Sequence, residues 1–106
     1  MDFVVEFTHT PDFCPHSNAG VRNVFEEQMR TGFPAALAER LGLAILFSGV
    51  AVPSHKSFMV MKGPDYAAVR RFFVESRIVQ ANEVQIHVTE SFAEFAEEIK
   101  GTEPIL

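Results

Sequence analysis

The sequence predicts an α+β fold in which a four-stranded antiparallel sheet carries its helices on one face. Three observations support this prediction. Along several short segments apolar residues alternate with polar ones, which is the two-residue period of strands. Between these segments apolar residues recur at helical spacing, and glycine and proline clusters separate the two kinds of segment. A chain of 106 residues is expected to form a single domain over 1–106.

The N-terminal part predicts a strand, a stiff loop and a helix. Residues 3–8 alternate, which indicates a strand with unlike faces. Residues 10–15 contain two prolines, which fix φ and remove backbone donors, so this loop is expected to be stiff. Ser17 or Asn18 is placed to cap the helix that follows. Its expected apolar side is formed by Val21, Val24, Phe25 and Gln28.

An interruption is expected after this first helix. Pro34 would lose a hydrogen bond and clash inside a helix, and Gly32 lies just before it, so we predict a kink or a short break. A second helical piece then runs through 37–41. Gly42 is placed to end that piece in the left-handed conformation.

Two strands and a helix are predicted in the middle of the chain. The apolar run 44–52 indicates a strand, 53–56 a turn, and 57–62 a returning strand. Asp65 is a candidate cap for the next helix, because it follows Gly63 and Pro64. The apolar positions of that helix are Tyr66, Val69, Phe72 and Phe73.

The last part of the chain predicts a strand and a further helix. Residues 83–89 alternate again. Ser91 and Glu94 have the spacing of a capping box. An apolar stripe then stops at Gly101, and its members are Phe92, Phe95, Ala96 and Ile99.

The order of these elements predicts the topology. Strand, helix, strand, strand, helix, strand is the split β-α-β, or ferredoxin-like, arrangement. The right-handed crossover rule leaves few alternatives to it. We therefore expect the first and third strands at the centre of the sheet, with an extra C-terminal helix.

Charge and composition exclude some classes of function. The chain has 9 Lys and Arg against 14 Asp and Glu, a net charge of −5, which argues against binding to nucleic acid. No apolar run approaches the roughly 20 residues of a membrane span. The single cysteine forms no intrachain disulfide, and the N-terminus lacks the positive region of a secretory signal, so we expect a cytoplasmic protein. Eleven phenylalanines predict a core rich in phenylalanine.

The composition of the sheet face that carries no helices predicts a second subunit. Its expected residues are too apolar for a fully hydrated surface and too polar for a dry core: Val4, Glu6, Thr8, Met59, Met61, Gln85 and His87. A homodimer in which two such faces meet would cover them and leave a semi-polar cavity between the sheets. The alternative is a monomer with exposed methionines.

A cluster of histidine and cysteine is the clearest chemical signal. His9, Cys14 and His16 lie within eight residues at the end of the first strand, and the predicted topology brings the turn containing His55 to the same sheet edge. Imidazole and thiolate are preferred ligands of zinc and copper, so these residues are candidate ligands of a transition metal. The spacing matches no standard zinc finger, and His16 is an additional candidate ligand beside His9, Cys14 and His55.

Other interpretations of the same residues stay open. Cys14 could be a small buried apolar side chain, with the histidines near it by chance. A thiol beside an imidazole could also act as a nucleophile with its base or as a redox-sensing thiolate, with Asp12 orienting a histidine.

Two segments resemble a known superfamily. Residues 7–14, Phe-Thr-His-Thr-Pro-Asp-Phe-Cys, and residues 52–58, Val-Pro-Ser-His-Lys-Ser-Phe, resemble small bacterial and archaeal proteins of the dimeric α/β-barrel, ferredoxin-like superfamily. The resemblance covers about the first 90 residues and matches His9, Cys14 and His55, whereas His16 lies outside the pattern. It implies a homodimer whose barrel encloses a cavity for a small molecule. Members of the superfamily include cofactor-free monooxygenases, lactone isomerases, haem-degrading enzymes and stress-response proteins.

Three classes of function are compatible with the sequence. The first is a small dimeric protein that binds a transition metal or a small ligand near His9, Cys14 and His55. The second is an enzyme of the monooxygenase or isomerase kind, with His87 and Glu6 as acid–base groups in the cavity between the sheets. The third is a non-catalytic stress-response or interaction module.

Overall fold

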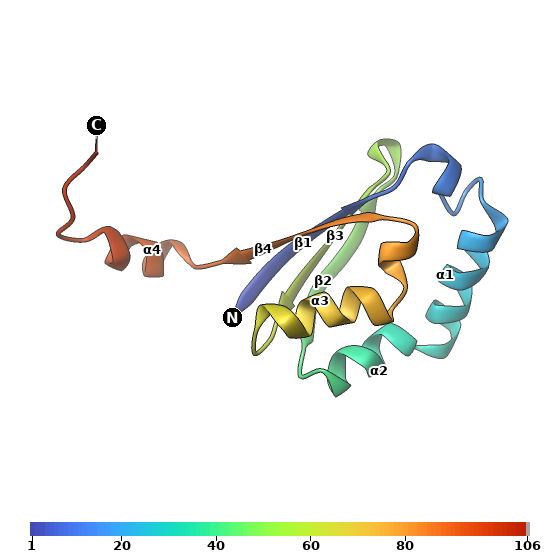
Figure 1. Ribbon diagram of the computed structural model, residues 1–106, viewed down its shortest axis with the longest axis horizontal. Coiled ribbons are helices and arrows are strands. Elements are labelled where there is room, and N and C mark those ends of the chain that lie inside the picture. Colours follow the sequence, from blue (N-terminus) through green and yellow to red (C-terminus); the bar gives the residue numbers. More distant parts are fainter. Residues whose placement is uncertain (106) are drawn as a thin grey trace.

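The computed structural model describes residues 1–105 and contains a four-stranded antiparallel sheet (Figure 1). The strands are β1 (Asp2–Thr8), β2 (Ala44–Ala51), β3 (Lys56–Lys62) and β4 (Glu83–Thr89). Their order in the sheet is β2-β3-β1-β4, so the first and third strands are central, as predicted. This α+β arrangement is consistent with a ferredoxin-like fold.

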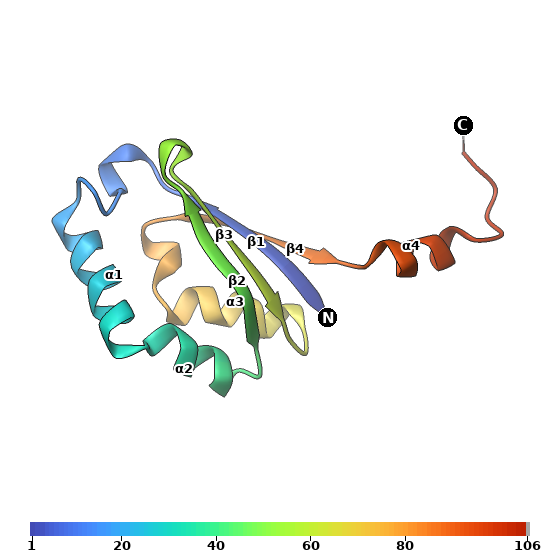
Figure 2. The same cartoon turned by 180° about the vertical axis from the view of Figure 1, so that it is seen from behind.

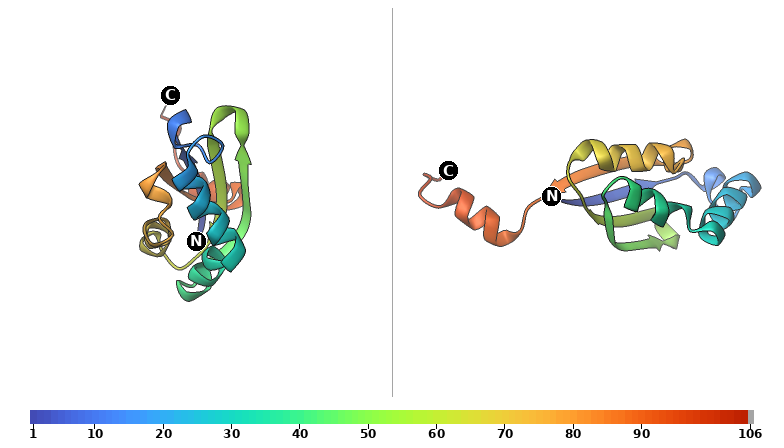
Figure 3. Two further views of the ribbon diagram at one scale, coloured as in Figure 1. Left: turned by 90° about the vertical axis from the view of Figure 1, so that its right-hand side faces the viewer. Right: turned by 90° about the horizontal axis from the view of Figure 1, so that it is seen from below.

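The helices are α1 (Ala19–Thr31), α2 (Phe33–Arg40), α3 (Tyr66–Glu75) and α4 (Phe92–Ile99). Helices α2 and α3 cover one face of the sheet, α1 lies on the same side near the loop end of the strands, and α4 extends away from the sheet (Figure 3). The left panel of Figure 3 shows α1, α2 and α3 on the same side of the sheet. Figure 2 shows that α4 continues outward from the end of β4. Within residues 1–105, no helix combines the length and apolar character needed to cross a bilayer.

The predicted helix ends are formed by local hydrogen bonds. The Asn18 side chain, rather than Ser17, accepts from the backbone N–H of Val21 at the start of α1. Gly32 separates α1 from α2 in the left-handed region, with φ 69°, so the interruption is a one-residue break. Pro34 follows within the first turn of α2, where its missing N–H breaks no helical bond.

The core lies between the covered sheet face, α2 and α3. Its central side chains are fully buried aromatic and aliphatic groups from both layers: Phe3, Val5, Leu37, Met61, Val69, Phe72 and Phe73. Phe72 and Phe73 meet edge to face with ring centroids 5.1 Å apart. An ion-pair group on the surface joins α2 to α3, since Glu75 contacts both Arg40 and Arg71.

The predicted composition of the uncovered face was wrong for its two methionines. Met61 pairs with Phe3 and Met59 with Val5, so the register places both methionines on the helix-covered face, where they are buried. The apolar residues of β3 on the uncovered face are instead Phe58 and Val60. The other members of the predicted set, from β1 and β4, do share that face with them: Val4, Glu6, Thr8, Gln85 and His87.

The phenylalanine-rich core is smaller than the composition suggests. Only Phe3, Phe72 and Phe73 are fully buried, whereas six phenylalanines are exposed: Phe13, Phe25, Phe33, Phe47, Phe92 and Phe95. Phe25 was predicted on the core side of α1, but α1 buries none of its residues completely. The described chain therefore presents much more aromatic surface than its sheet and helices cover.

Candidate metal centre

The sheet itself brings two of the candidate ligands together. His9 follows the last residue of β1, and His55 precedes the first residue of β3, and these two strands are paired. The backbone N–H of His9 donates to the carbonyl of His55 at 3.2 Å, which extends the strand ladder by one pair. The predicted convergence of these residues is thus a consequence of neighbouring strands ending at one edge.

His55 has an unusual backbone conformation. It ends the short 3-10 helix η2 (Val52–Ser54) with φ 52° and ψ 39°, in the left-handed region. Non-glycine residues rarely occupy this region, which costs on the order of 1–2 kcal/mol for an L-residue. The turn nevertheless holds a histidine there, with its ring 5.2 Å from the ring of His9, centroid to centroid. Such strain is often found where a side chain has a functional position.

Cys14 reaches the same place from the stiff loop. It follows the 3-10 helix η1 (Pro11–Phe13), and its backbone N–H donates to the carbonyl of Pro11 at 3.3 Å. Its own carbonyl accepts from the N–H groups of Ser17 and Asn18, at 2.9 and 2.8 Å. Cys14 is 6% exposed. The loop is therefore fixed on both sides of the cysteine, which holds the thiol in the protein interior.

The ligand atoms of the three residues form a compact group. One atom each from His9, Cys14 and His55 lies within 4.8 Å of the other two. Nε2 of His9 and Nδ1 of His55 are 3.4 Å apart. Two imidazole nitrogens bound to a tetrahedral zinc ion lie about 3.3 Å apart, and a nitrogen and a thiolate about 3.6 Å apart. The histidines thus already match such a site, and the sulfur would have to approach by about 1.2 Å at most.

Asn82 orients His9, and the sequence analysis missed it. The Asn82 side-chain nitrogen donates to the carbonyl of Ile78 at 3.1 Å, which turns its Oδ1 toward His9. Nδ1 of His9 lies 3.2 Å from that oxygen and donates to it. The proton of a neutral His9 is therefore on Nδ1, and the lone pair of Nε2 faces His55. Outer hydrogen bonds of this kind orient histidine ligands in metal sites.

The register between β1 and β4, rather than any sequence pattern, identifies Asn82 as the neighbour of His9. Thr8 pairs with Glu83 across β1 and β4, so the residue before Glu83 lies beside His9. To identify this neighbour of His9 one needs the strand order and the exact register. The alternating pattern of residues 83–89 supplies neither.

The remaining predicted site residues lie elsewhere. His16 is exposed, and it is not part of the three-residue group. His87 and Glu6 are on neighbouring strands and face the uncovered side of the sheet, where His87 is exposed. Glu6 is half-buried with Lys56 at 3.9 Å. The structure thus separates these two acid–base candidates from the His/Cys cluster.

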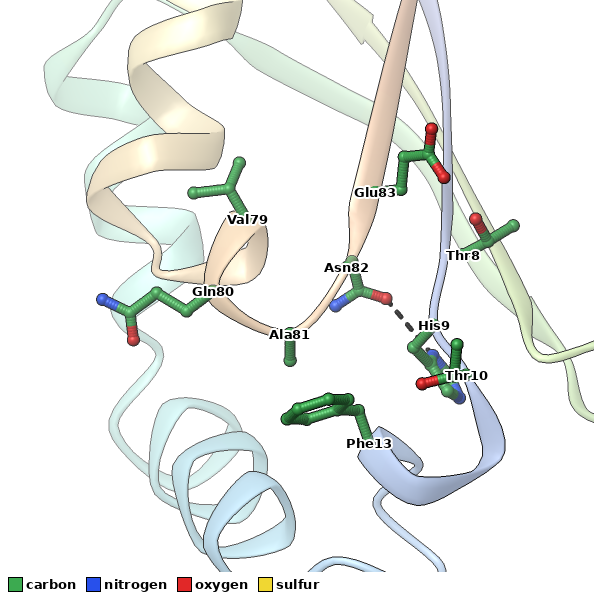
Figure 4. Close-up of a pocket in the computed structure, with 9 residues that line it drawn as sticks. All are labelled: Thr8, His9, Thr10, Phe13, Val79, Gln80, Ala81, Asn82 and Glu83. Carbon is green, nitrogen blue, oxygen red and sulfur yellow. Dashed lines mark hydrogen bonds between the residues drawn. The ribbon is translucent and has the colours of Figure 1, made fainter.

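An open cleft of about 420 Å³ borders the cluster (Figure 4). It lies between the loop containing η1 and the segment from η3 (Ile78–Gln80) to the start of β4. His9 and Asn82 are both in its wall, and Figure 4 shows the hydrogen bond between them beside Phe13 and Ala81. A small molecule in this cleft would thus touch the residue that orients a candidate ligand.

Together, the fold and the cluster define an α+β protein with a donor set of two imidazoles and one thiol. No protein-family model matches the chain, and no curated protein or solved structure was found to be similar to it. Conclusions about function therefore depend on the geometry of this molecule alone.

Proposed function

We propose that the protein binds one transition-metal ion, zinc or copper, through His9 Nε2, Cys14 Sγ and His55 Nδ1. The observation that carries the proposal is that one ligand atom from each of the three residues lies within 4.8 Å of the other two, although His55 is far from His9 and Cys14 in the sequence. The donor set also supports it, because imidazole and thiolate suit both ions and no carboxylate belongs to the group.

The number of ligands favours an open site over a closed structural one. Structural zinc sites are almost always completed by four protein ligands, whereas sites with three keep a position for water or another small molecule. The neighbouring cleft supports a small ligand as the occupant of that position. A bound ion would supply Lewis acidity there, while the chain itself provides the orientation of His9 through Asn82.

Elemental analysis of the untagged protein, purified without chelator, tests the proposal. We expect about one zinc or copper ion per chain, and its loss in the Cys14→Ala/His55→Ala double variant. The matched control is His16→Ala, because His16 is exposed and outside the group. It should retain the metal.

A cobalt titration gives an independent readout of the ligands. Replacement of the native ion by Co²⁺ should produce a thiolate-to-metal charge-transfer absorption in the ultraviolet, absent in Cys14→Ala. Metal at trace levels in the native protein, together with no cobalt spectrum, would overturn the proposal. The alternative of an enzyme using His87 and Glu6 stays a prediction, as does that of a non-catalytic interaction module.

A further inference from the structure

The C-terminal segment, residues 90–105, extends away from the rest of the chain as an arm (Figures 1 and 2). Its helix α4 has only eight residues. An isolated helix shorter than about 12 residues is only marginally stable in water, so a helix of this length depends on packing against another surface. Yet Phe92 is 94% exposed and Ile99 50% exposed.

The surface area of the chain indicates how much contact is missing. The accessible surface is 7430 Å², whereas a folded monomer of 11.8 kDa is expected to expose about 5,900 Å². The radius of gyration is 16.5 Å, against about 13 Å for a compact domain of this length. The excess of about 1,500 Å² per chain would give about 3,000 Å² for a pair, which is in the range of obligate homodimers.

A matching acceptor surface exists on the same chain. On the uncovered sheet face, Phe47 lies over Gly49, where an added Cβ would come within 2.9 Å of the ring. Phe58 and Val60 are paired with Gly49 and Phe47 on that face. Phe47 is 57% exposed, and it lies on β2, an edge strand. An edge strand with exposed apolar side chains needs a cover to avoid uncontrolled association.

Charge favours contact between the arm and this surface. The arm has five glutamates and one lysine, so its side chains carry −4 of the total charge of −5. Strands β2 and β3 have two lysines and no carboxylate. Lys56 and Lys62 lie on the uncovered face, because they are in phase with Phe58 and Val60. Lys56 already contacts Glu6 of β1 at 3.9 Å, so Lys62 is the lysine of this face that has no ion pair within residues 1–105. An acidic arm is therefore complementary in charge to the β2–β3 side of the sheet.

We propose that the arm of one chain docks on the β2–β3 side of the uncovered sheet face of a second copy, and that the exchange is reciprocal. Each chain then provides one arm and one acceptor, so a two-fold axis satisfies both and closes the assembly. This inference is independent of the metal site, because neither the arm nor the acceptor includes His9, Cys14 or His55.

Light scattering on the full-length protein after size exclusion tests the proposal. At about 100 μM the wild type should have twice the mass of one chain, and Phe92→Glu/Phe95→Glu should have the mass of one chain. Phe47→Glu, in the acceptor, should also be monomeric. The matched control is Phe25→Glu, an exposed phenylalanine of α1 in the helix layer, which should stay dimeric.

Circular dichroism and metal content of the same samples distinguish loss of the dimer from loss of the fold and from loss of the metal. Far-ultraviolet spectra should show that each variant keeps its fold, because all the substituted side chains are exposed. A wild type with the mass of one chain would overturn the proposal, and so would a dimer that survives the arm substitutions. A mass that increases with concentration beyond that of two chains would also overturn it. In that case each arm would dock on a further copy in an open series, and no closed pair would form. Metal content reports on the metal proposal separately.

Discussion

The two ends of the sheet differ in how many of their polar and apolar side chains find partners within one chain. At the loop end, β1, the β2–β3 turn and the start of β4 meet, and hydrogen bonds within the chain fix His9, Cys14 and Asn82. At the other end, β4 leads into an arm whose phenylalanines are exposed. The first region is organised by contacts within the chain, whereas the second has the apolar stripe of a packed helix with Phe92 almost fully exposed. A candidate site and a candidate interface thus occupy opposite ends of one small sheet.

The largest expected effect is on the free energy of unfolding, in a comparison of a core phenylalanine with an arm phenylalanine. Phe72→Ala should lower the free energy of unfolding by about 3–5 kcal/mol, because it removes a fully buried ring and leaves a cavity. Phe92→Ala should change it by less than about 0.5 kcal/mol, because that ring is 94% exposed. Urea unfolding at a protein concentration where the chains are separated measures both. Equal losses in the two variants would mean that the arm packs on its own chain.

The next effect concerns the orientation of His9. Asn82→Ala removes the acceptor for His9 Nδ1 and should weaken zinc or copper binding about 10- to 100-fold, as removal of such outer partners does. Competition with a metal-binding dye measures the affinity. Gln80→Ala is the matched control, because Gln80 lines the same cleft but has no contact that orients His9. Equal affinities in Asn82→Ala and the wild type would show that the ring is held by other contacts.

How much of this structure the sequence predicts depends on how far apart in the sequence the interacting residues are. Local signals identified the strands, a cap at Ser17 or Asn18, an interruption near Gly32 and the capping box of α4, because each depends on a few adjacent residues. The convergence of His9 and His55 was predictable from topology. The faces of β3 were not, because alternation gives two faces without saying which one is covered. The pairing of Met61 with Phe3 decides that, and it is a long-range contact.

Asn82 and the arm show two further limits of prediction from the sequence. The role of Asn82 depends on a register between β1 and β4 that is fixed only in the folded sheet. The stripe of α4 was recognised as that of a packed helix, but periodicity cannot say whether the surface it packs on belongs to the same chain. The position of the arm, directed away from the body, adds that information.

A smaller effect is expected at the start of α1. Asn18 accepts from the N–H of Val21 and also donates to the carbonyl of Asp12, so it joins the helix to the loop that holds Cys14. Asn18→Ala should therefore cost about 1 kcal/mol of stability, the usual loss for an N-cap. Thermal unfolding measures it. Asn23→Ala, an exposed change inside the same helix, should have little effect or stabilise slightly, because alanine has the higher helix propensity. An equal loss of stability in Asn23→Ala would show that the loss in Asn18→Ala is not specific to the cap.

The smallest effect is electrostatic and belongs to the arm. The pKa of Glu90 is raised above its ordinary value of 4.5, first by a hydrogen bond with the Glu98 side chain and then by the negative charges of Glu98 and Glu94. A raised pKa in the folded arm means that the protonated form is favoured there. This contribution is therefore complete below the ordinary value and is lost as the pH rises through the raised one.

The helical content of the arm should accordingly increase slightly as the pH falls toward 4.5. Nuclear magnetic resonance can follow the Glu90 carboxyl carbon through the titration and report the pKa directly. In Glu98→Gln the charge repulsion disappears, so the pKa of Glu90 should move down toward its ordinary value. Glu103→Gln is the control, because Glu103 is not among the groups that act on Glu90. An unchanged pKa in Glu98→Gln would show that Glu90 and Glu98 are not adjacent, and that the arm has a different conformation in solution.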